Sequence, residues 1–251
     1  MRVFAGPNGS GKSTVIDNVR AYRANGKAID FGYYVNADEI AAALKDKGFS
    51  FDKFDITVTR RDFNGAAALS GLLTKEFPEE RFRGSYVFSG NGIRATDADA
   101  IDRLAQITAD YLRYRLLSEH KRFSFETVFS HQSKLDIMKA AVASGYKVYL
   151  YFVSTESWEI NAFRVKARKA KGGHDVPADK IESRYYRSLG LLYEAAQVAY
   201  QVYFFDNSVD NASHELFAHF RKTGDKKEWD EVNEANVPNW FRKYYKPQKK
   251  A

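Results

Sequence analysis

The sequence predicts an α/β fold in which a central sheet of five parallel strands lies between two layers of helices. Short apolar runs alternate with stretches of helical periodicity, and this alternation is typical of βαβ units. A glycine-rich segment separates the first apolar run from the first helical stretch, a position at which α/β proteins often bind phosphate groups. The chain has 251 residues, of which 44% are hydrophobic, so it is long enough to bury a large core.

Five segments have the length and apolar character of buried strands, and helical stretches separate them. They are residues 2–5, 33–36, 122–126, 147–153 and 201–206. One intervening helix is expected to begin at Ser133 and to end before Gly145, because serine favours the start of a helix and glycine its end. After residue 206 we expect a further helix that runs through Phe217 and Phe220.

The glycine-rich segment matches the phosphate-binding P-loop pattern G-x-x-x-x-G-K-[S/T]. Residues 6–14 are Gly-Pro-Asn-Gly-Ser-Gly-Lys-Ser-Thr. The glycines allow the backbone to curl with its N–H groups pointing inward, and the first turn of the next helix adds further N–H groups. We expect Lys12 to neutralise the β- and γ-phosphates of ATP and Ser13 to bind Mg²⁺. The predicted nucleotide ligands are Asn8, Gly9, Ser10, Gly11, Lys12, Ser13 and Thr14.

The residues on both sides support a P-loop. An apolar strand over residues 2–5 precedes the loop, and apolar residues at helical spacing follow it over 13–22. The alternative is a glycine-rich turn that contains a lysine by chance. Such a turn would not require a strand before it and a helix after it. The sequence therefore predicts a P-loop NTPase fold of the nucleotide-kinase type.

Phosphoryl transfer also needs a group that takes the proton of the acceptor hydroxyl. Asp38 follows the second predicted strand, at the carboxyl edge where open α/β sheets bind ligands. We predict that Asp38 is this group and that it contacts the acceptor substrate. The alternative is that Asn36 or Asp38 only caps the following helix.

An acidic residue close to Mg²⁺ is expected where a strand beside the P-loop strand ends. Strand 122–126 ends in Glu126, and we predict that Glu126 binds Mg²⁺ or substrate with help from Thr127. Strand 201–206 ends in Asp206 and is a rival for this role. Because that strand follows the basic segment, we expect Asp206, Asn207 and Ser208 to lie near the base of the nucleotide.

Cations that cover the migrating phosphoryl group are predicted in a basic segment over residues 160–190. Arg164 and Arg168 are spaced i, i+4 and share a helix face, and Arg184 and Arg187 are spaced i, i+3 on the next helix. We predict that this segment is a lid that closes on ATP, with Arg164, Arg168 and Arg184 as catalytic cations. The alternative is a solvated basic hairpin.

Residues 172–177 lie between the two arginine pairs. Two glycines end the first helix and Pro177 suits the start of the second, so these residues are expected to form the hinge of the lid. His174 belongs to this hinge. A hinge hydrogen bond is the expected role of His174, in preference to that of a catalytic base.

Residues 1–220 are predicted to form one kinase domain. Residues 53–91 interrupt the alternation of strands and helices, and we expect them to be an insertion that binds the acceptor substrate. Residues 221–251 are expected to form a basic, solvated tail, although Trp229 and Trp240 can pack back onto the domain.

The formal net charge of +7 and the pI near 9.3 arise mainly from residues 160–187 and 238–251. The first of these segments suits a polyphosphate ligand, so nucleic acid is not the expected partner. The chain has no cysteine, and its apolar stretches are too short to span a bilayer. Because the N-terminal residues do not resemble a signal peptide either, we expect a soluble cytoplasmic protein without a membrane partner.

The ordered set of motifs resembles the zeta-toxin-like P-loop kinases, especially their chromosomal branch. The matching segments are residues 4–14, 35–40, 123–131, 172–177, 184–189 and 205–208. The resemblance implies phosphorylation of a UDP-activated amino sugar and an antitoxin-like protein partner. It also implies that Asp38 is the acceptor-activating aspartate, that Lys12 is the P-loop lysine, and that Arg164 or Arg168 is a lid arginine.

The chain departs from that family in three places. It has Glu126-Thr127-Val128 where the toxins carry Glu-Gly-Thr. The second lid arginine of the toxins corresponds to residues 174–177, which are His-Asp-Val-Pro in this chain. Only Arg184 or Arg187, on the following helix, could replace it. Residues 53–91 have no counterpart. The resemblance therefore supports kinase chemistry more strongly than the amino-sugar acceptor, and it supports toxicity least.

These observations together predict an ATP- and Mg²⁺-dependent kinase that phosphorylates a hydroxyl group of a small molecule. One alternative is a polynucleotide-end kinase whose basic tail holds RNA or DNA. The other is a nucleotide-gated binding module without kinase activity.

Overall fold

The computed structural model describes residues 1–170, 176–210, 214–224 and 226–245. The chain divides into two compact units. The first contains Met1–Phe31 and Ser124–Ala251, and the second contains Gly32–Phe123. This division differs from the expected single domain over residues 1–220 followed by a tail.

The sheet of the first unit contains the strand order β12-β11-β10-β9-β1-β8. Four strands of this order are parallel, namely β1 (Arg2–Ala5), β8 (Phe123–Thr127), β9 (Tyr149–Ser154) and β10 (Gln201–Asp206). The fifth predicted strand, β4 (Tyr33–Val35), also forms and belongs to the second unit. The expected α/β fold with a mostly parallel sheet is therefore confirmed.

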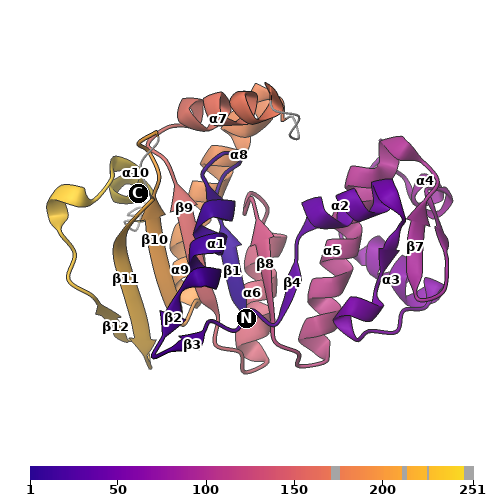
Figure 1. Ribbon diagram of the computed structural model, residues 1–251, viewed down its shortest axis with the longest axis horizontal. Coiled ribbons are helices and arrows are strands. Elements are labelled where there is room, and N and C mark those ends of the chain that lie inside the picture. Colours follow the sequence, from indigo (N-terminus) through magenta and orange to yellow (C-terminus); the bar gives the residue numbers. More distant parts are fainter. Residues whose placement is uncertain (171–175, 211–213, 225, 246–251) are drawn as a thin grey trace, which may run out of the picture. The chain divides into compact units, whose positions relative to one another are not determined.

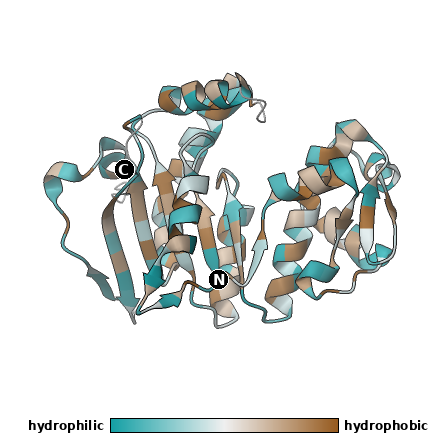
Figure 2. Ribbon diagram, viewed as in Figure 1, coloured by the Kyte–Doolittle hydropathy of each residue, from teal (hydrophilic) through white to brown (hydrophobic). Residues whose placement is uncertain are grey.

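Helices cover both faces of this sheet (Figure 1). Helix α1 (Lys12–Ala21) lies on one face, and α6 (Ser133–Ala143) and α9 (Leu192–Val198) lie on the other. A small hairpin of β2 (Arg23–Ala24) and β3 (Lys27–Ala28) follows α1. The apolar residues concentrate in the central strands (Figure 2), where Val3, Phe4 and Phe152 are fully buried. The predicted three-layer arrangement is thus present.

Two antiparallel strands extend the sheet beyond β10, and they overturn the helix expected through Phe217 and Phe220. These strands are β11 (Glu215–Thr223) and β12 (Lys226–Trp229). The register between β10 and β11 shifts at Phe204 and Phe205, so that Phe217 is an extra residue in β11. This bulge lets Phe217 and Phe220 both pack on Phe204. A bulged strand can therefore bury apolar residues three apart, which is the spacing of a helix face.

The expected solvated tail is also wrong for the residues that the structure describes. After β12 the chain forms a short 3₁₀ helix (Glu234–Asn236) and helix α10 (Asn239–Tyr244). Trp240 is only 2% exposed and contacts the rings of Phe152 and Phe217. Aromatic burial on this scale stabilises a fold by several kcal/mol, so this segment is part of the first unit.

The predicted lid segment forms two helices that contact each other, α7 (Trp158–Ala170) and α8 (Ala178–Gly190). Val176 is buried against Val165 of α7 and Ile181 of α8, and this apolar contact joins the pair. The predicted hinge residues 172–175, including His174, lie outside the described residues.

The second unit has a core of its own. Its helices are α2 (Ala37–Asp46), α3 (Arg60–Leu69), α4 (Glu79–Gly84) and α5 (Ile101–Ser118), and β5 (Phe49–Ser50), β6 (Tyr86–Phe88) and β7 (Gly92–Ala95) form a small antiparallel sheet. Short 3₁₀ helices lie at Asp52–Phe54 and Ala98–Ala100. Phe63 lies at the centre of the core and contacts the rings of Phe51, Phe82, Tyr86 and Tyr111. The predicted insertion over residues 53–91 is thus one part of a larger unit.

None of the helices in the described ranges is both long enough and apolar enough to cross a bilayer.

Candidate functional site

The predicted P-loop connects β1 to α1 in the first unit, as expected. Its residues 6–11 lie between the end of β1 at Ala5 and the start of α1 at Lys12. Gly9 has φ of 78°, and an added Cβ would lie 2.5 Å from the carbonyl oxygen of Asn161. Neither the left-handed backbone nor this close approach tolerates a side chain. Gly9, which lies between the two fixed glycines of the motif, is therefore required for the curled loop to pack against α7.

Lys12 is held inside the curl of the loop. The side chain is nearly buried, with 7% of the residue exposed, and Nζ donates a hydrogen bond of 3.0 Å to the carbonyl oxygen of Pro7. The same ammonium group lies 3.8 Å from Oε1 of Glu126. The carbonyl oxygen and the carboxylate together offset the cost of burying this ammonium group.

Glu126 reaches this position because β8 lies directly beside β1. Phe4 is paired with Glu126 and Ala5 with Thr127 in a parallel register. The hydroxyl oxygen of Thr127 accepts a hydrogen bond from the backbone N–H of Phe129, whose φ is 59°. Thr127 thus stabilises the turn after β8, and its predicted contact with substrate remains a prediction.

The oxygen donors near Lys12 fit a magnesium ion. Ser13 is exposed in the first turn of α1 and offers a hydroxyl, and Glu126 offers a carboxylate. Mg²⁺ prefers such oxygen ligands and takes the rest of its coordination from phosphates and water in nucleotide sites. Within the described ranges, no cluster of three acidic, histidine or cysteine side chains is arranged for a metal. A site that is completed by phosphates is consistent with this donor set.

Arg184 of α8 is the predicted arginine that contacts the P-loop. Its Nη1 donates a hydrogen bond of 3.4 Å to Oδ1 of Asn8. Burial lowers the pKa of Arg184, and the neighbouring Arg187 lowers it further. An arginine still remains charged at neutral pH, because its ordinary pKa lies above 12. Lys12 and Arg184 therefore both lie close to the P-loop.

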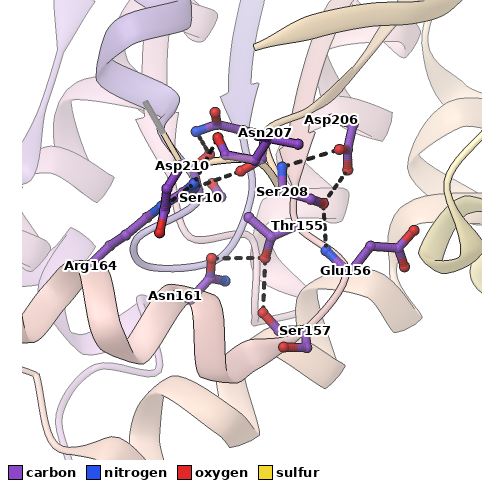
Figure 3. Close-up of polar contacts among 11 residues, drawn as sticks. Ser10, Thr155, Glu156, Ser157, Asn161, Arg164, Asp206, Asn207, Ser208 and Asp210 are labelled. Atoms are coloured by element: carbon purple, nitrogen blue, oxygen red, sulfur yellow. Dashed lines mark hydrogen bonds and ion pairs between the residues drawn. The ribbon is translucent and has the colours of Figure 1, made fainter. Parts of the chain in front are cut away.

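Arg164 of α7 instead binds the loop that follows β10 (Figure 3). Nε and Nη2 donate to Oδ1 of Asp210 at 2.9 and 2.6 Å, and Nη1 donates to the carbonyl oxygen of Asn207 at 2.6 Å. Arg168 is exposed one turn further along α7. Arg164 therefore binds the loop after β10, whereas Arg184 contacts the P-loop.

A pocket of about 360 Å³ lies between α1, α7 and the loop after β10. Its lining residues are Thr14, Phe163, Arg164, Asn207, Val209, Asp210 and His214. Phe163 and Val209 are large apolar residues that are 64% and 66% exposed. Nε2 of His214 lies 3.2 Å from the amide nitrogen of Asn18, and burial lowers the pKa of this ring, which favours its neutral form. Sequence reasoning missed Phe163, Val209, Asp210 and His214, because no motif joins them.

Asp206 and Ser208 hold the loop after β10 in place (Figure 3). The Asp206 carboxylate accepts hydrogen bonds from the Ser208 hydroxyl at 2.8 Å and from Nε1 of Trp240 at 2.8 Å. The Ser208 hydroxyl also accepts from the backbone N–H of Glu156 at 2.8 Å. These contacts give both residues a structural role, and they argue against Asp206 as the rival Mg²⁺ ligand.

Asp38 lies in the first turn of α2 in the second unit, with its side chain exposed. The cap of this helix is Asn36, whose Oδ1 accepts from the N–H groups of Asp38 at 2.8 Å and Glu39 at 3.4 Å. The side chain of Asn36 therefore supplies the cap, and the carboxylate of Asp38 remains available for chemistry.

Comparison with known proteins supports the fold. No protein-family model matches the chain. An uncharacterized protein of Haemophilus influenzae is 34% identical over 87 residues, which are 33% of this chain and 62% of the relative. Two crystal structures of the AvrRxo1-ORF1:AvrRxo1-ORF2 complex, one with sulphate ions and one with ATP, match with TM-scores of 0.56 and 0.54 at 15% identity.

Each of these two matches covers 98% of this chain but 63% of the matched chain. The chain therefore spans less than two thirds of the relative and of the matched structures. At 15% identity the likeness establishes a shared fold.

Proposed function

We propose that the chain is an ATP-dependent phosphotransferase that moves the γ-phosphoryl group of ATP to a hydroxyl group of a small molecule. The observation that carries the proposal is the nearly buried Lys12 ammonium, held between Pro7 of the curled loop and Glu126. The AvrRxo1-ORF1:ORF2 structure that contains ATP supports the same choice of nucleotide.

The proposed step needs few groups from the protein. The acceptor oxygen forms a bond to the γ-phosphorus while the bond from that phosphorus to the β–γ bridging oxygen breaks. ADP leaves with the bonding electron pair, and the acceptor proton passes to a carboxylate, for which we propose Asp38. Lys12 and the N–H groups of the P-loop bind the phosphates, and Arg184 stabilises the charge on the phosphoryl group in flight.

Ser13 and Glu126 are the residues that we propose to hold Mg²⁺. When bound, the ion neutralises the phosphate oxygens and orients the phosphates. Glu126 also lies 3.8 Å from Lys12, and its carboxylate offsets part of the cost of burying the ammonium group.

The pocket beside Thr14 is proposed to receive the nucleoside end of ATP. Thr14 follows the phosphate-binding residues along α1, so the pocket begins where the phosphate cradle ends. Phe163 and Val209 offer exposed apolar surface for a base. Because Arg164 donates to Asp210 and Asn207, we propose that its guanidinium plane stacks on the base and does not bind a phosphate.

The acceptor and the partner are proposed from resemblance. Zeta-toxin-like kinases suggest a UDP-activated amino sugar as the acceptor. The matched AvrRxo1-ORF1 is seen together with AvrRxo1-ORF2, and on this basis we propose that an antitoxin-like protein binds the present chain.

The direct test is ADP release from the full chain with Mg²⁺ and a panel of acceptors that includes UDP-amino sugars and oligonucleotides. Acceptor-stimulated release that is lost in Lys12→Ala supports the proposal. Stimulation by oligonucleotide ends alone would indicate a polynucleotide kinase, and tight ATP binding with no stimulated release would indicate a binding module. Absence of any calorimetric heat with ATP and Mg²⁺ would overturn the proposal.

A further inference from the structure

We infer that Asn207 is a positioning residue for the P-loop: its side-chain amide fixes the peptide between Ser10 and Gly11 so that the N–H of Gly11 faces the phosphates. The inference rests on the proposed function. It assigns to Asn207 a role different from the nucleotide contact that the sequence predicts.

The backbone of Asn207 is fixed on two sides. Its N–H donates a hydrogen bond of 2.9 Å to the carbonyl oxygen of Ser154 at the end of β9. Its carbonyl oxygen accepts the hydrogen bond of 2.6 Å from Arg164. A residue held by both backbone groups can direct its side chain with little further loss of entropy.

The side chain of Asn207 is directed at the P-loop (Figure 3). Nδ2 donates a hydrogen bond of 2.9 Å to the carbonyl oxygen of Ser10. This contact joins residues that are 197 positions apart in the sequence. It links the loop after β10 to the phosphate cradle.

Gly11 makes room for this contact. Its φ is 92°, and an added Cβ would lie 2.2 Å from Nδ2 of Asn207. No other residue type fits at this position without moving the amide group of Asn207. The second glycine of the motif and Asn207 therefore form one arrangement.

The planarity of the peptide group determines the direction of the Gly11 N–H. In a planar trans peptide the C=O and the N–H point in opposite directions. When the oxygen of Ser10 is anchored on Asn207, the N–H of Gly11 must point away from Asn207. The inference places that N–H on the side of the loop where Nζ of Lys12 binds the oxygen of Pro7. Asn207 thereby preorganises one donor of the anion site.

Calorimetric titration of the full chain with two Mg²⁺-bound probes, ATP and inorganic tripolyphosphate, tests the inference. Tripolyphosphate has no base or ribose, so it reports on the phosphate cradle alone. Asn207→Ala is expected to weaken both probes by a similar factor of about ten, the effect of one hydrogen bond to a charged ligand. Asn207→Asp is expected to weaken both further, because a carboxylate cannot donate to the carbonyl oxygen of Ser10 and repels it.

The matched control is Asn233→Ala. Asn233 also uses its side chain to bind backbone in the first unit, with Oδ1 accepting from the N–H of Ala235 at 3.1 Å, but it lies outside the site. This variant should bind both probes like the wild type. Thermal unfolding of each variant verifies that the chain is folded.

A second readout follows the Gly11 amide by ¹⁵N–¹H NMR. Tripolyphosphate should shift this resonance strongly in the wild type and at most half as far in Asn207→Ala at saturation. Loss of ATP binding with unchanged tripolyphosphate binding would overturn the inference and make Asn207 a nucleoside contact. Unchanged binding of both probes in Asn207→Ala would also overturn it. A wild type that binds neither probe would instead remove the proposed function, and the inference with it.

Discussion

The ammonium group of Lys12, at the start of α1, lies 3.8 Å from the carboxylate of Glu126 near the end of β8. The pairing of Phe4 with Glu126 brings the end of β8 to the P-loop. Two residues that are far apart in the sequence thus form the charged centre of the candidate site, and the other parts of the site are arranged around them.

Lys12→Ala should reduce acceptor-stimulated ADP release by about a hundredfold or more, because a preorganised cation beside the phosphates is lost. It should also weaken ATP binding. Lys166→Ala is the control, since it removes an exposed cation of α7 that does not line the site. Wild-type turnover in Lys12→Ala would contradict the assignment of the P-loop.

Arg164→Ala and Arg184→Ala should have different effects. Arg184→Ala should lower turnover by about a thousandfold, as expected for an arginine that stabilises a phosphoryl group in transfer. Arg164→Ala should weaken the binding of ATP more than that of tripolyphosphate, because the proposed contact of Arg164 is with the nucleoside, and the smaller loss for tripolyphosphate comes from the lost hydrogen bond to the carbonyl oxygen of Asn207. Equal losses for both ligands in Arg164→Ala would contradict the proposed nucleoside contact.

Asp38→Asn should lower turnover by about a hundredfold or more, since a general base contributes a factor of this size. ATP affinity should stay near that of the wild type. Asn36→Ala is the comparison, because it removes the helix cap and should cost about 1 kcal/mol of stability. If Asp38→Asn retains full turnover, another group takes the proton.

Trp240→Ala should lower the free energy of unfolding by about 3–5 kcal/mol, the usual cost of truncating a large buried aromatic residue. Trp240 is 2% exposed, and its Nε1 donates to Asp206 next to the site loop. Urea unfolding measures the loss. A change of less than about 0.5 kcal/mol, typical of a surface position, would mean that α10 does not pack as described.

Lys227 should make stability depend on pH between about 8 and 9.5. Burial, with a smaller effect of Lys222, lowers its pKa to about 8, whereas an unfolded lysine has a pKa near 10.4. The unfolded chain therefore binds more protons in this range, so the contribution of Lys227 to the free energy of unfolding increases as pH rises. Urea unfolding at pH 7.5, 8.5 and 9.5 should show this increase in the wild type relative to Lys227→Met. The prediction would be contradicted if the free energy of unfolding changed with pH in the same way in both proteins.

The position of Lys227 accounts for this lowered pKa. Nζ lies over the rings of Tyr193, Phe220 and Tyr245 and donates to the hydroxyl of Tyr245 at 3.0 Å. These rings displace water that would otherwise hydrate the ammonium group, and the lost hydration exceeds the favourable cation–π contact.

Several features could be predicted because they depend on neighbours in the chain. The P-loop over residues 6–14 is recognisable from spacing, and strand β1 and helix α1 form on either side of it. The helix of residues 133–143 begins at Ser133 as expected. The position of Glu126 at the end of a strand beside β1 also followed from the usual order of such folds.

Other features could not be predicted because they depend on distant contacts. The spacing of Phe217 and Phe220 indicated a helix, yet the segment is strand β11. A bulge opposite Phe204 and Phe205 lets this strand bury both residues on the same side. Arg164 and Arg184 have similar sequence surroundings, but Arg164 meets Asp210, 46 residues away, and Arg184 meets Asn8, 176 residues away. Charge alone does not say which partner a side chain will reach.

The sequence by itself determined the α/β alternation and the phosphate-binding loop of this protein, since hydrophobic period and glycine positions act over a few residues. Only the tertiary structure decided which cation approaches the loop, how the C-terminal segment packs, and that Asn207 anchors Ser10. The reason is physical: these contacts form between side chains that the folded sheet brings together, and their energies depend on distance and burial rather than on sequence spacing.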